Sequence, residues 1–71
     1  MDTAKLKGKM RELGVTQEEL AKLIGVSLST LNRKLQDNGD SFTIGEIQRT
    51  VKALHLSSDD ARIIFLPEQS Q

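Results

Sequence analysis

Apolar residues recur at intervals of three and four along most of the chain, the spacing of one face of an α-helix. The first such stripe consists of Leu6, Met10 and Leu13. Gly14 follows it, and glycine often ends a helix because it adopts the left-handed conformation without strain. We therefore predict a helix over residues 3–13. No stretch alternates apolar and polar residues for long enough to predict a strand.

Two more helices are predicted on either side of Gly25. Thr16, followed by Glu19 three positions later, predicts a capping box at the start of the first of them. Ser27 is the predicted cap of the second, which should stop near the Asn-Gly turn at residues 38–39. The apolar stripes of the two helices are Leu20, Leu23 and Ile24 in the first, and Leu28, Leu31 and Leu35 in the second.

The second half of the chain predicts two further helices. Thr43 and Glu46 form a second capping box, and Ser57 or Ser58 caps a shorter last helix that Pro67 closes. The stripe of the fourth helix is Ile44, Ile47, Val51 and Leu54. The predicted architecture is therefore one compact all-α domain of five helices over residues 1–66, followed by a flexible tail over residues 67–71.

Composition narrows the function classes. The 71 residues suffice for one domain, and the absence of cysteine excludes a disulfide and a thiolate metal site. The sequence offers no paired base and nucleophile, no metal-ligand cluster and no glycine-rich phosphate loop, so we expect neither an enzyme nor a cofactor or metal site. His55, the single histidine, lies at a predicted helix end, where it complements the helix dipole or is simply exposed. No apolar run is long enough to span a membrane.

Charge is balanced overall but not along the chain. Residues 1–35 carry seven basic and four acidic side chains, whereas residues 36–71 carry three basic and six acidic ones. A net charge of zero argues against a nucleic-acid binder, but this uneven distribution permits one face to meet phosphate while the other faces away.

The two helices around Gly25 are joined very closely. Such a short turn with glycine makes the helices cross steeply, and the positive φ that it needs disfavours any Cβ. Ala21 leaves room for the neighbouring helix, while Val26 and Leu31 fill the angle between the two.

The string TQEELAKLIGVSLSTLNRKL resembles the helix-turn-helix of the phage repressor and Cro family, also called the XRE family. The matching residues are Thr16-Gln17, Leu20-Ala21, Ile24-Gly25-Val26, Ser27 and Leu31. A basic helix before the motif and the segment NG followed by FTIGEIQRTVKALHLS after it extend the resemblance over residues 3–66. It implies a lambda-repressor-like domain whose helix-turn-helix unit spans residues 16–35, with residues 27–36 as the recognition helix in the major groove.

The resemblance also implies which residues bind DNA or a partner. Gln17, at a helix N-terminus, contacts a phosphate or is merely exposed. Arg33 reads guanine, contacts phosphate or is solvated, and Asn32 reads adenine or lies at the surface. Leu28 touches a thymine methyl or packs in the core. The full set is Gln17, Ser27, Leu28, Ser29, Thr30, Asn32 and Arg33.

Two further surfaces are expected. Lys7, Arg11 and Lys34 are candidates for the DNA backbone, although Lys5 and Lys9 share the other face of the first helix. Acids at residues 37 and 40 would repel DNA if they faced it. The apolar run Ile63, Ile64, Phe65 and Leu66 either caps the core or forms a surface for a homodimer or another partner.

Two functions remain open. The first is a sequence-specific transcriptional regulator of the Cro or repressor type that binds an operator in double-stranded DNA. The second is a phage anti-repressor or modulator that binds a partner repressor protein through its helix-turn-helix surface. Either would act in the cytoplasm of a bacterial or phage-infected cell, with no membrane partner.

Overall fold

The computed structural model describes residues 1–66, and every regular element in that part is a helix. The elements are α1 (Thr3–Leu13), α2 (Gln17–Ile24), α3 (Leu28–Gln36), α4 (Ile44–Ala53) and α5 (Ser58–Phe65). The predicted all-α fold of five helices is confirmed. No helix between residues 1 and 66 has the length and apolar character needed to cross a bilayer. Pro67 and the predicted tail over residues 67–71 lie outside the described residues.

Each helix begins where a short polar side chain caps it. Asp2, Thr16, Ser27, Thr43 and Ser57 each accept a hydrogen bond from the backbone amide three residues further on. Both predicted capping boxes are present, at the starts of α2 and α4. Because these signals lie within four residues of sequence, they define the helix starts independently of the tertiary fold.

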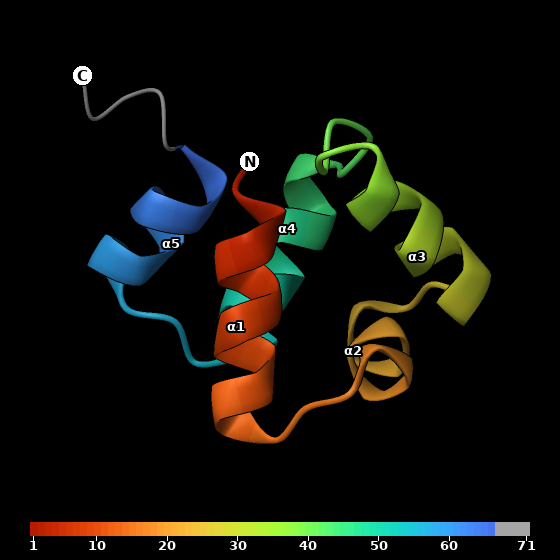
Figure 1. The fold of residues 1–71 in the computed structure, drawn as a ribbon, viewed down its shortest axis with the longest axis horizontal. Helices are drawn as coiled ribbons and strands as arrows, with labels where there is room; N and C mark the ends of the chain where they lie inside the picture. The colour runs from red at the N-terminus through yellow and green to blue at the C-terminus, as the bar shows by residue number, and fades with distance from the viewer. Residues whose placement is uncertain (67–71) are drawn as a thin grey trace.

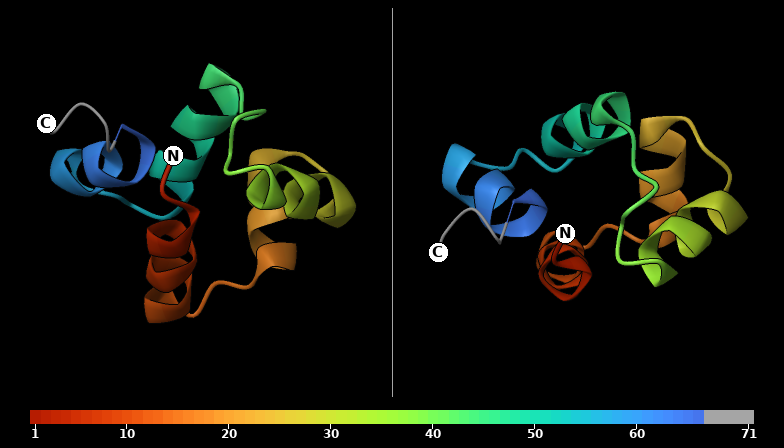
Figure 2. Two further views of the ribbon diagram at one scale, coloured as in Figure 1. Left: turned by 45° about the horizontal axis from the view of Figure 1, so that its top comes forward. Right: turned by 90° about the horizontal axis from the view of Figure 1, so that it is seen from above.

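The helices surround one small core. α1 and α4 lie in the middle, α5 lies on one side of them, and α2 and α3 lie on the other (Figures 1 and 2). α2 packs on both α3 and α4, and α1 packs on α5. The buried apolar residues of the core come from α1, α2, α3 and α5 and from the segments that flank α4: Leu6, Met10, Leu20, Ala21, Ile24, Leu31, Leu35, Phe42, Leu54, Leu56 and Ile64. α4 itself adds the partly buried Ile47, Val51 and Ala53.

Four apolar residues that the periodicity placed in apolar stripes lie at the surface instead. Leu13 is 45% exposed, Leu23 is 56%, Leu28 is 40% and Ile44 is 75%. Leu13 and Ile44 occupy the outermost turns of their helices, and α2 turns Leu20, Ala21 and Ile24 to its neighbours instead of Leu23.

The inward face of α4 is partly polar. Glu46 and Thr50 are buried there, and Thr50 is completely inaccessible to solvent. The Thr50 hydroxyl donates a hydrogen bond of 2.8 Å to the Glu46 carbonyl, so its burial leaves no polar atom unpaired. At the N-terminal end of α4, the buried face therefore differs from the one predicted from the apolar residues: it contains Glu46 and Thr50 and not Ile44.

Candidate nucleic-acid interface

The junction between α2 and α3 has the geometry that the sequence predicts. Gly25 has a φ of 82°, and its amide donates to the Ala21 carbonyl at 2.9 Å. The Val26 amide donates to the same carbonyl at 2.9 Å, so the end of α2 is closed by two hydrogen bonds before the chain turns. Ala21 and Leu31 are buried, and Val26 packs against the core. The turn is thus fixed by backbone bonds inside and apolar contacts behind it.

The outer face of α3 presents most of the residues assigned to DNA or partner binding. Ser27, Leu28, Ser29 and Arg33 are exposed, and Thr30 and Asn32 are half-buried. Leu28 is 40% exposed and is not a core residue, unlike Leu31 and Leu35 behind it. Arg33 makes no ion pair within residues 1–66. The first two turns of α3 therefore present an exposed leucine, Leu28, and the guanidinium of Arg33, which has no ion-pair partner in residues 1–66.

Two hydroxyl groups at the start of α3 are occupied by the helix itself. The Ser27 Oγ accepts from the Thr30 amide at 3.1 Å and donates to the Thr30 Oγ1 at 2.8 Å. The Ser29 Oγ lies 3.3 Å from the Ser27 Oγ. Since Ser27 already donates its hydroxyl hydrogen to Thr30, it can only accept from a base, whereas Ser29, Thr30, Asn32 and Arg33 can still donate.

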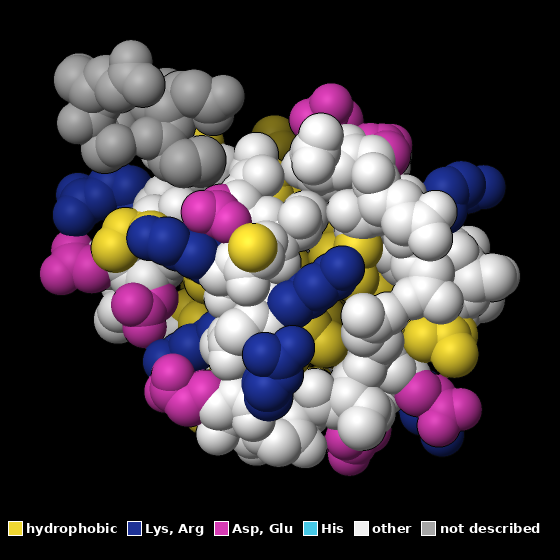
Figure 3. Space-filling model, in the orientation of Figure 1, with side chains coloured by type: hydrophobic (Ala, Val, Ile, Leu, Met, Phe, Trp, Pro, Cys, Tyr) yellow, Lys and Arg dark blue, Asp and Glu magenta, His cyan; other side chains and the backbone are white. Residues whose placement is uncertain are grey.

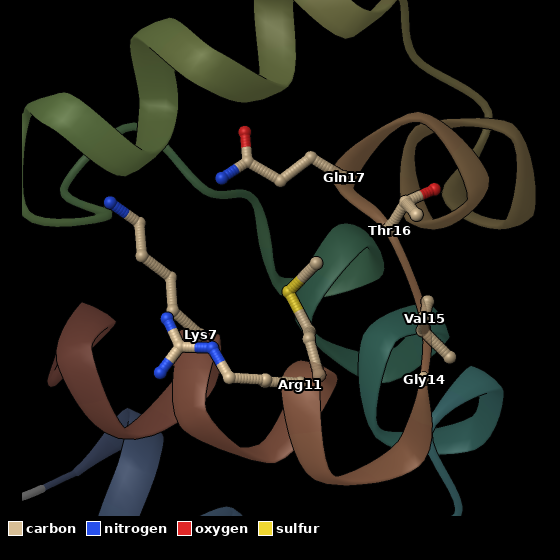
Figure 4. A pocket seen from close by; sticks show the side chains of 7 residues that line it. Lys7, Arg11, Gly14, Val15, Thr16 and Gln17 are labelled. Carbon is tan, nitrogen blue, oxygen red and sulfur yellow. The ribbon is translucent and has the colours of Figure 1, made fainter.

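An open hollow of about 380 Å³ lies between α1 and the start of α2. Lys7 and Arg11 reach toward it from α1, and the Gln17 amide reaches toward it from α2, while α3 runs along its edge (Figure 4). Basic side chains are visible in the middle of this face, beside a recess with a hydrophobic floor (Figure 3). Met10 and Val15 contribute apolar surface to the lining. The structure thus brings two residues of the predicted phosphate set, Lys7 and Arg11, together with Gln17 from the predicted DNA- or partner-binding set.

On the other basic face of α1, Lys9 is paired with carboxylates. The Lys9 Nζ lies 3.2 Å from the Glu12 Oε1 and 3.4 Å from the Asp60 Oδ2. Hydrogen bonds to Glu12 and Asp60 raise the pKa of Lys9 above its ordinary value. Lys5, Lys7 and Arg11 make no ion pair within the described part of the chain. Both charges are therefore available on the face with Lys7 and Arg11, but only that of Lys5 on the other face.

The first turn of α2, which begins at the hollow, carries both signs of charge. Its unpaired amides carry the positive end of the helix dipole, whereas Glu18 in the same turn is exposed and negative. Glu19 is used for capping, because its Oε1 accepts from the Thr16 amide at 2.9 Å. That hydrogen bond holds the pKa of Glu19 below its ordinary value.

Lys34, also assigned to phosphate from the sequence, is elsewhere in the structure. It is 8% exposed, its Nζ donates to the Ser41 carbonyl at 2.7 Å, and it lies 3.1 Å from the Glu46 Oε1. The Thr43 amide first, and Lys34 next, lower the pKa of Glu46. A signal for this was present, because Lys34 follows the buried Leu31 by three residues and so shares its inward face. We leave Lys34 out of the candidate interface.

Sequence reasoning missed Arg49. Its Nε donates to the Ile24 carbonyl at 3.0 Å and so joins α4 to the end of α2, directly before the turn. The two residues are 25 positions apart, and no local pattern indicates such a contact.

The apolar run at the end of α5 does not form one surface. Ile64 is buried, Phe65 is half-buried, and Ile63 and Leu66 are exposed on different sides. Ile63 borders a hollow beside α1, whereas Phe65 and Leu66 line an apolar groove of about 370 Å³ against α4, with Ile44 at its border. The run therefore both caps the core and contributes exposed apolar surface.

A family model described as helix-turn-helix matches residues 6–60, which include α1 to α4 and the start of α5. No curated protein and no solved structure gave a significant match. Within residues 1–66, no group of three or more His, Cys, Asp or Glu side chains is placed to hold a metal ion.

Proposed function

Because the chain belongs to the phage repressor and Cro (XRE) family of helix-turn-helix DNA-binding regulators, we propose that it is a small sequence-specific transcriptional regulator of the Cro or repressor type. It acts by occupying an operator in double-stranded DNA, in the cytoplasm of a bacterial or phage-infected cell. α3 enters the major groove, and the hollow between α1 and α2 lies against the phosphate backbone.

The observation that supports this most is the adjacency of two kinds of surface. α3, whose exposed residues include Arg33 and Leu28, runs near a hollow bordered by Lys7, Arg11 and Gln17 (Figure 4). Base edges require side chains that protrude into a groove, and phosphates require charges that have no partner in the free protein. Both requirements are met on adjoining parts of a molecule whose net charge is zero.

The side chains suggest a division of roles. Arg33 donates two hydrogen bonds to guanine, Asn32 pairs with adenine, and Leu28 contacts a thymine methyl. Lys7, Arg11 and Gln17 hold backbone phosphates and so set the position of α3 on the duplex.

A salt titration of DNA binding tests the proposal. We expect selective binding to DNA from upstream of the protein's own gene over random DNA, with affinity that falls steeply as salt rises. Arg33→Ala should weaken selective binding by about 1–3 kcal/mol, whereas Lys52→Ala, which removes an exposed cation on α4, should have no effect. Lys7→Met should lower the salt slope by about 0.9, and Lys52→Met on α4 should leave it unchanged.

A second function is favoured by the exposed leucines. Leu23 is 56% exposed on α2 and Leu28 is 40% exposed at the start of α3. Apolar side chains on this part of the molecule suit a protein partner better than phosphate. If binding is weak and equal on both DNAs, and the protein forms a stoichiometric complex with a partner repressor, the modulator role replaces the regulator role.

We also propose that two copies pair on a two-fold symmetric operator, which would place two reading helices about 34 Å apart. The groove between α4 and α5, with Ile44 exposed beside it, is the apolar surface that would meet the second copy. A stable interface needs about 800 Å² from each partner, roughly a sixth of this chain's 4673 Å². Pairing through so small a groove is therefore expected to be weak in solution and complete on DNA, which sedimentation with and without a palindromic duplex would test.

A further inference from the structure

α3 is attached to the rest of the molecule mainly along one side. It packs on α2, and α2 packs on α4, but α3 and α4 make few direct contacts. The loop between α3 and α4 contains two residues with positive φ, Asn38 at 59° and Gly39 at 75°. Packing on α2 alone therefore does not fix the position of the C-terminal end of α3 relative to α4.

A buried ion pair spans this gap. The Lys34 Nζ from α3 lies 3.1 Å from the Glu46 Oε1 of α4, and both side chains are 10% exposed. The same ammonium donates to the Ser41 carbonyl at 2.7 Å and lies 5.8 Å from the centre of the Phe42 ring. One side chain thus joins α3, the loop and the start of α4.

The acidic partner is itself held in place. The Glu46 Oε1 also accepts from the Thr43 amide at 3.0 Å, and the Thr43 Oγ1 accepts from the Glu46 amide at 3.0 Å. The carboxylate is therefore fixed to the N-terminus of α4 before Lys34 reaches it. α4 is in turn joined to the end of α2 through Arg49, so one helix holds both halves of the helix-turn-helix.

Such a pair restricts the orientation of the helices that it joins more than it raises the free energy of unfolding. Removing two charges from water nearly offsets their attraction, and apolar residues of similar size often stabilise a fold equally well. Hydrogen bonds at fixed angles, however, restrict how a helix can rotate or slide, which apolar contacts do much less.

We propose that Lys34 is a positioning residue for DNA reading, which through Glu46 fixes the C-terminal end of α3 against α4 and so sets the angle at which Asn32 and Arg33 meet base edges. The inference rests on the proposed function of α3 as the recognition helix. It assigns to Lys34 a role in selectivity, not a contact with phosphate.

The test compares variants that remove the pair with one that restores it. Lys34→Met keeps the length of the side chain without its charge, and Glu46→Gln removes the charge while a glutamine at this position still completes the capping box. Lys34→Arg retains a cation that can reach Glu46. Affinities for operator and random DNA are measured over a range of salt, at a temperature where circular dichroism shows each variant folded.

Lys34→Met and Glu46→Gln should each lower the ratio of operator to random-DNA affinity about tenfold, the loss expected from one misaligned base contact. Lys34→Arg should recover most of that ratio. The salt slope should stay unchanged in all three, whereas Lys7→Met lowers it by about 0.9. A Lys34→Met protein that keeps the ratio but loses slope would place Lys34 on phosphate, and one that only melts earlier would make the pair structural; either result overturns the proposal.

Amide hydrogen exchange in the free protein separates this inference from the function on which it rests. Lys34→Met should speed exchange in the last turn of α3 and leave α2 unchanged. If the wild type fails to select operator DNA while this exchange pattern holds, the proposed function is wrong and the tie between α3 and α4 still stands. If Lys34→Met instead changes the exchange rates of α2 and α3 to the same extent, Lys34 does not specifically restrain the end of α3.

Discussion

The N-termini of α2 and α4 are built from the same motif but have opposite surroundings. In both, a threonine accepts from the backbone amide of a glutamate three residues later, and that glutamate accepts from the amide of the threonine. The hydrogen bonds are 2.9–3.1 Å long in each case. Glu19 is exposed, however, whereas Glu46 is buried and paired with Lys34.

The difference shows that a local motif defines a helix start but not its role in the fold. The start of α2 borders an open hollow, so its amides and Gln17 remain available to an anion. The start of α4 is closed by Lys34 from α3, so the same chemistry joins two helices. Four predictions test which parts of the two sites differ and which are the same.

The largest effect is expected from Glu46→Ala. This change removes one partner of a buried pair and leaves the Lys34 ammonium without its carboxylate, which should lower the free energy of unfolding by about 3 kcal/mol. Glu19→Ala, at the exposed site, should lower it far less. Urea denaturation followed by circular dichroism measures both, and equal losses would show that burial does not distinguish the two carboxylates.

Removing the capping hydroxyl should affect both sites equally. Thr16→Ala and Thr43→Ala each lose one hydrogen bond to a helix amide and should each destabilise the fold by about 1 kcal/mol. Thr16→Ser and Thr43→Ser keep the hydroxyl and serve as controls. A loss at residue 43 much greater than at residue 16 would mean that the Lys34 pair depends on the threonine as well as on Glu46.

Lowering the pH should destabilise the fold through both glutamates. The loss should be smaller than that from removing a capping side chain, because a protonated carboxyl still has an oxygen that accepts the amide hydrogen bond. The threonine amide lowers the pKa of each glutamate, Glu19 through Thr16 and Glu46 through Thr43. The stability that they contribute is therefore full above the ordinary glutamate pKa of about 4.5 and is lost as the pH falls through the lower folded pKa. Thermal unfolding between pH 6 and pH 3 should show a shallower acid loss for Glu46→Gln, and an unchanged pH profile would contradict this linkage.

The sequence predicted those features of the fold that depend on neighbouring residues. The capping boxes at Thr16 and Thr43 and the glycine turn at Gly25 each lie within a few positions, and all appear as predicted. Gly14 likewise ends α1 with a φ of 71°. Local hydrogen bonds and backbone conformation were sufficient for these elements.

The sequence predicted less where distant segments meet. It placed Lys34 on phosphate because a lysine near a recognition helix is usually exposed, but Glu46 from another helix buries it. It gave no indication that Arg49 reaches the Ile24 carbonyl. Of the candidate interface, the sequence identified Lys7, Arg11 and Gln17 separately, and the fold shows that they border one hollow.

The smallest effect is expected from Ile44→Ala, at the first residue of α4. It tests whether the helical period or the contacts with other helices decide which side chains of α4 are buried. The helical period assigns Ile44 to the buried stripe, yet its side chain is 75% exposed, because Glu46 and Thr50 occupy the inward face. Truncation should therefore change the free energy of unfolding by less than about 0.5 kcal/mol. Leu54→Ala, at the buried C-cap residue of the same helix, should lower it by about 2–5 kcal/mol. A loss at Ile44 similar to that at Leu54 would mean that this isoleucine is covered in solution, which requires either a rotated α4 or a second copy seated on the groove. Repeating the measurement at several protein concentrations distinguishes these, since only the second depends on concentration.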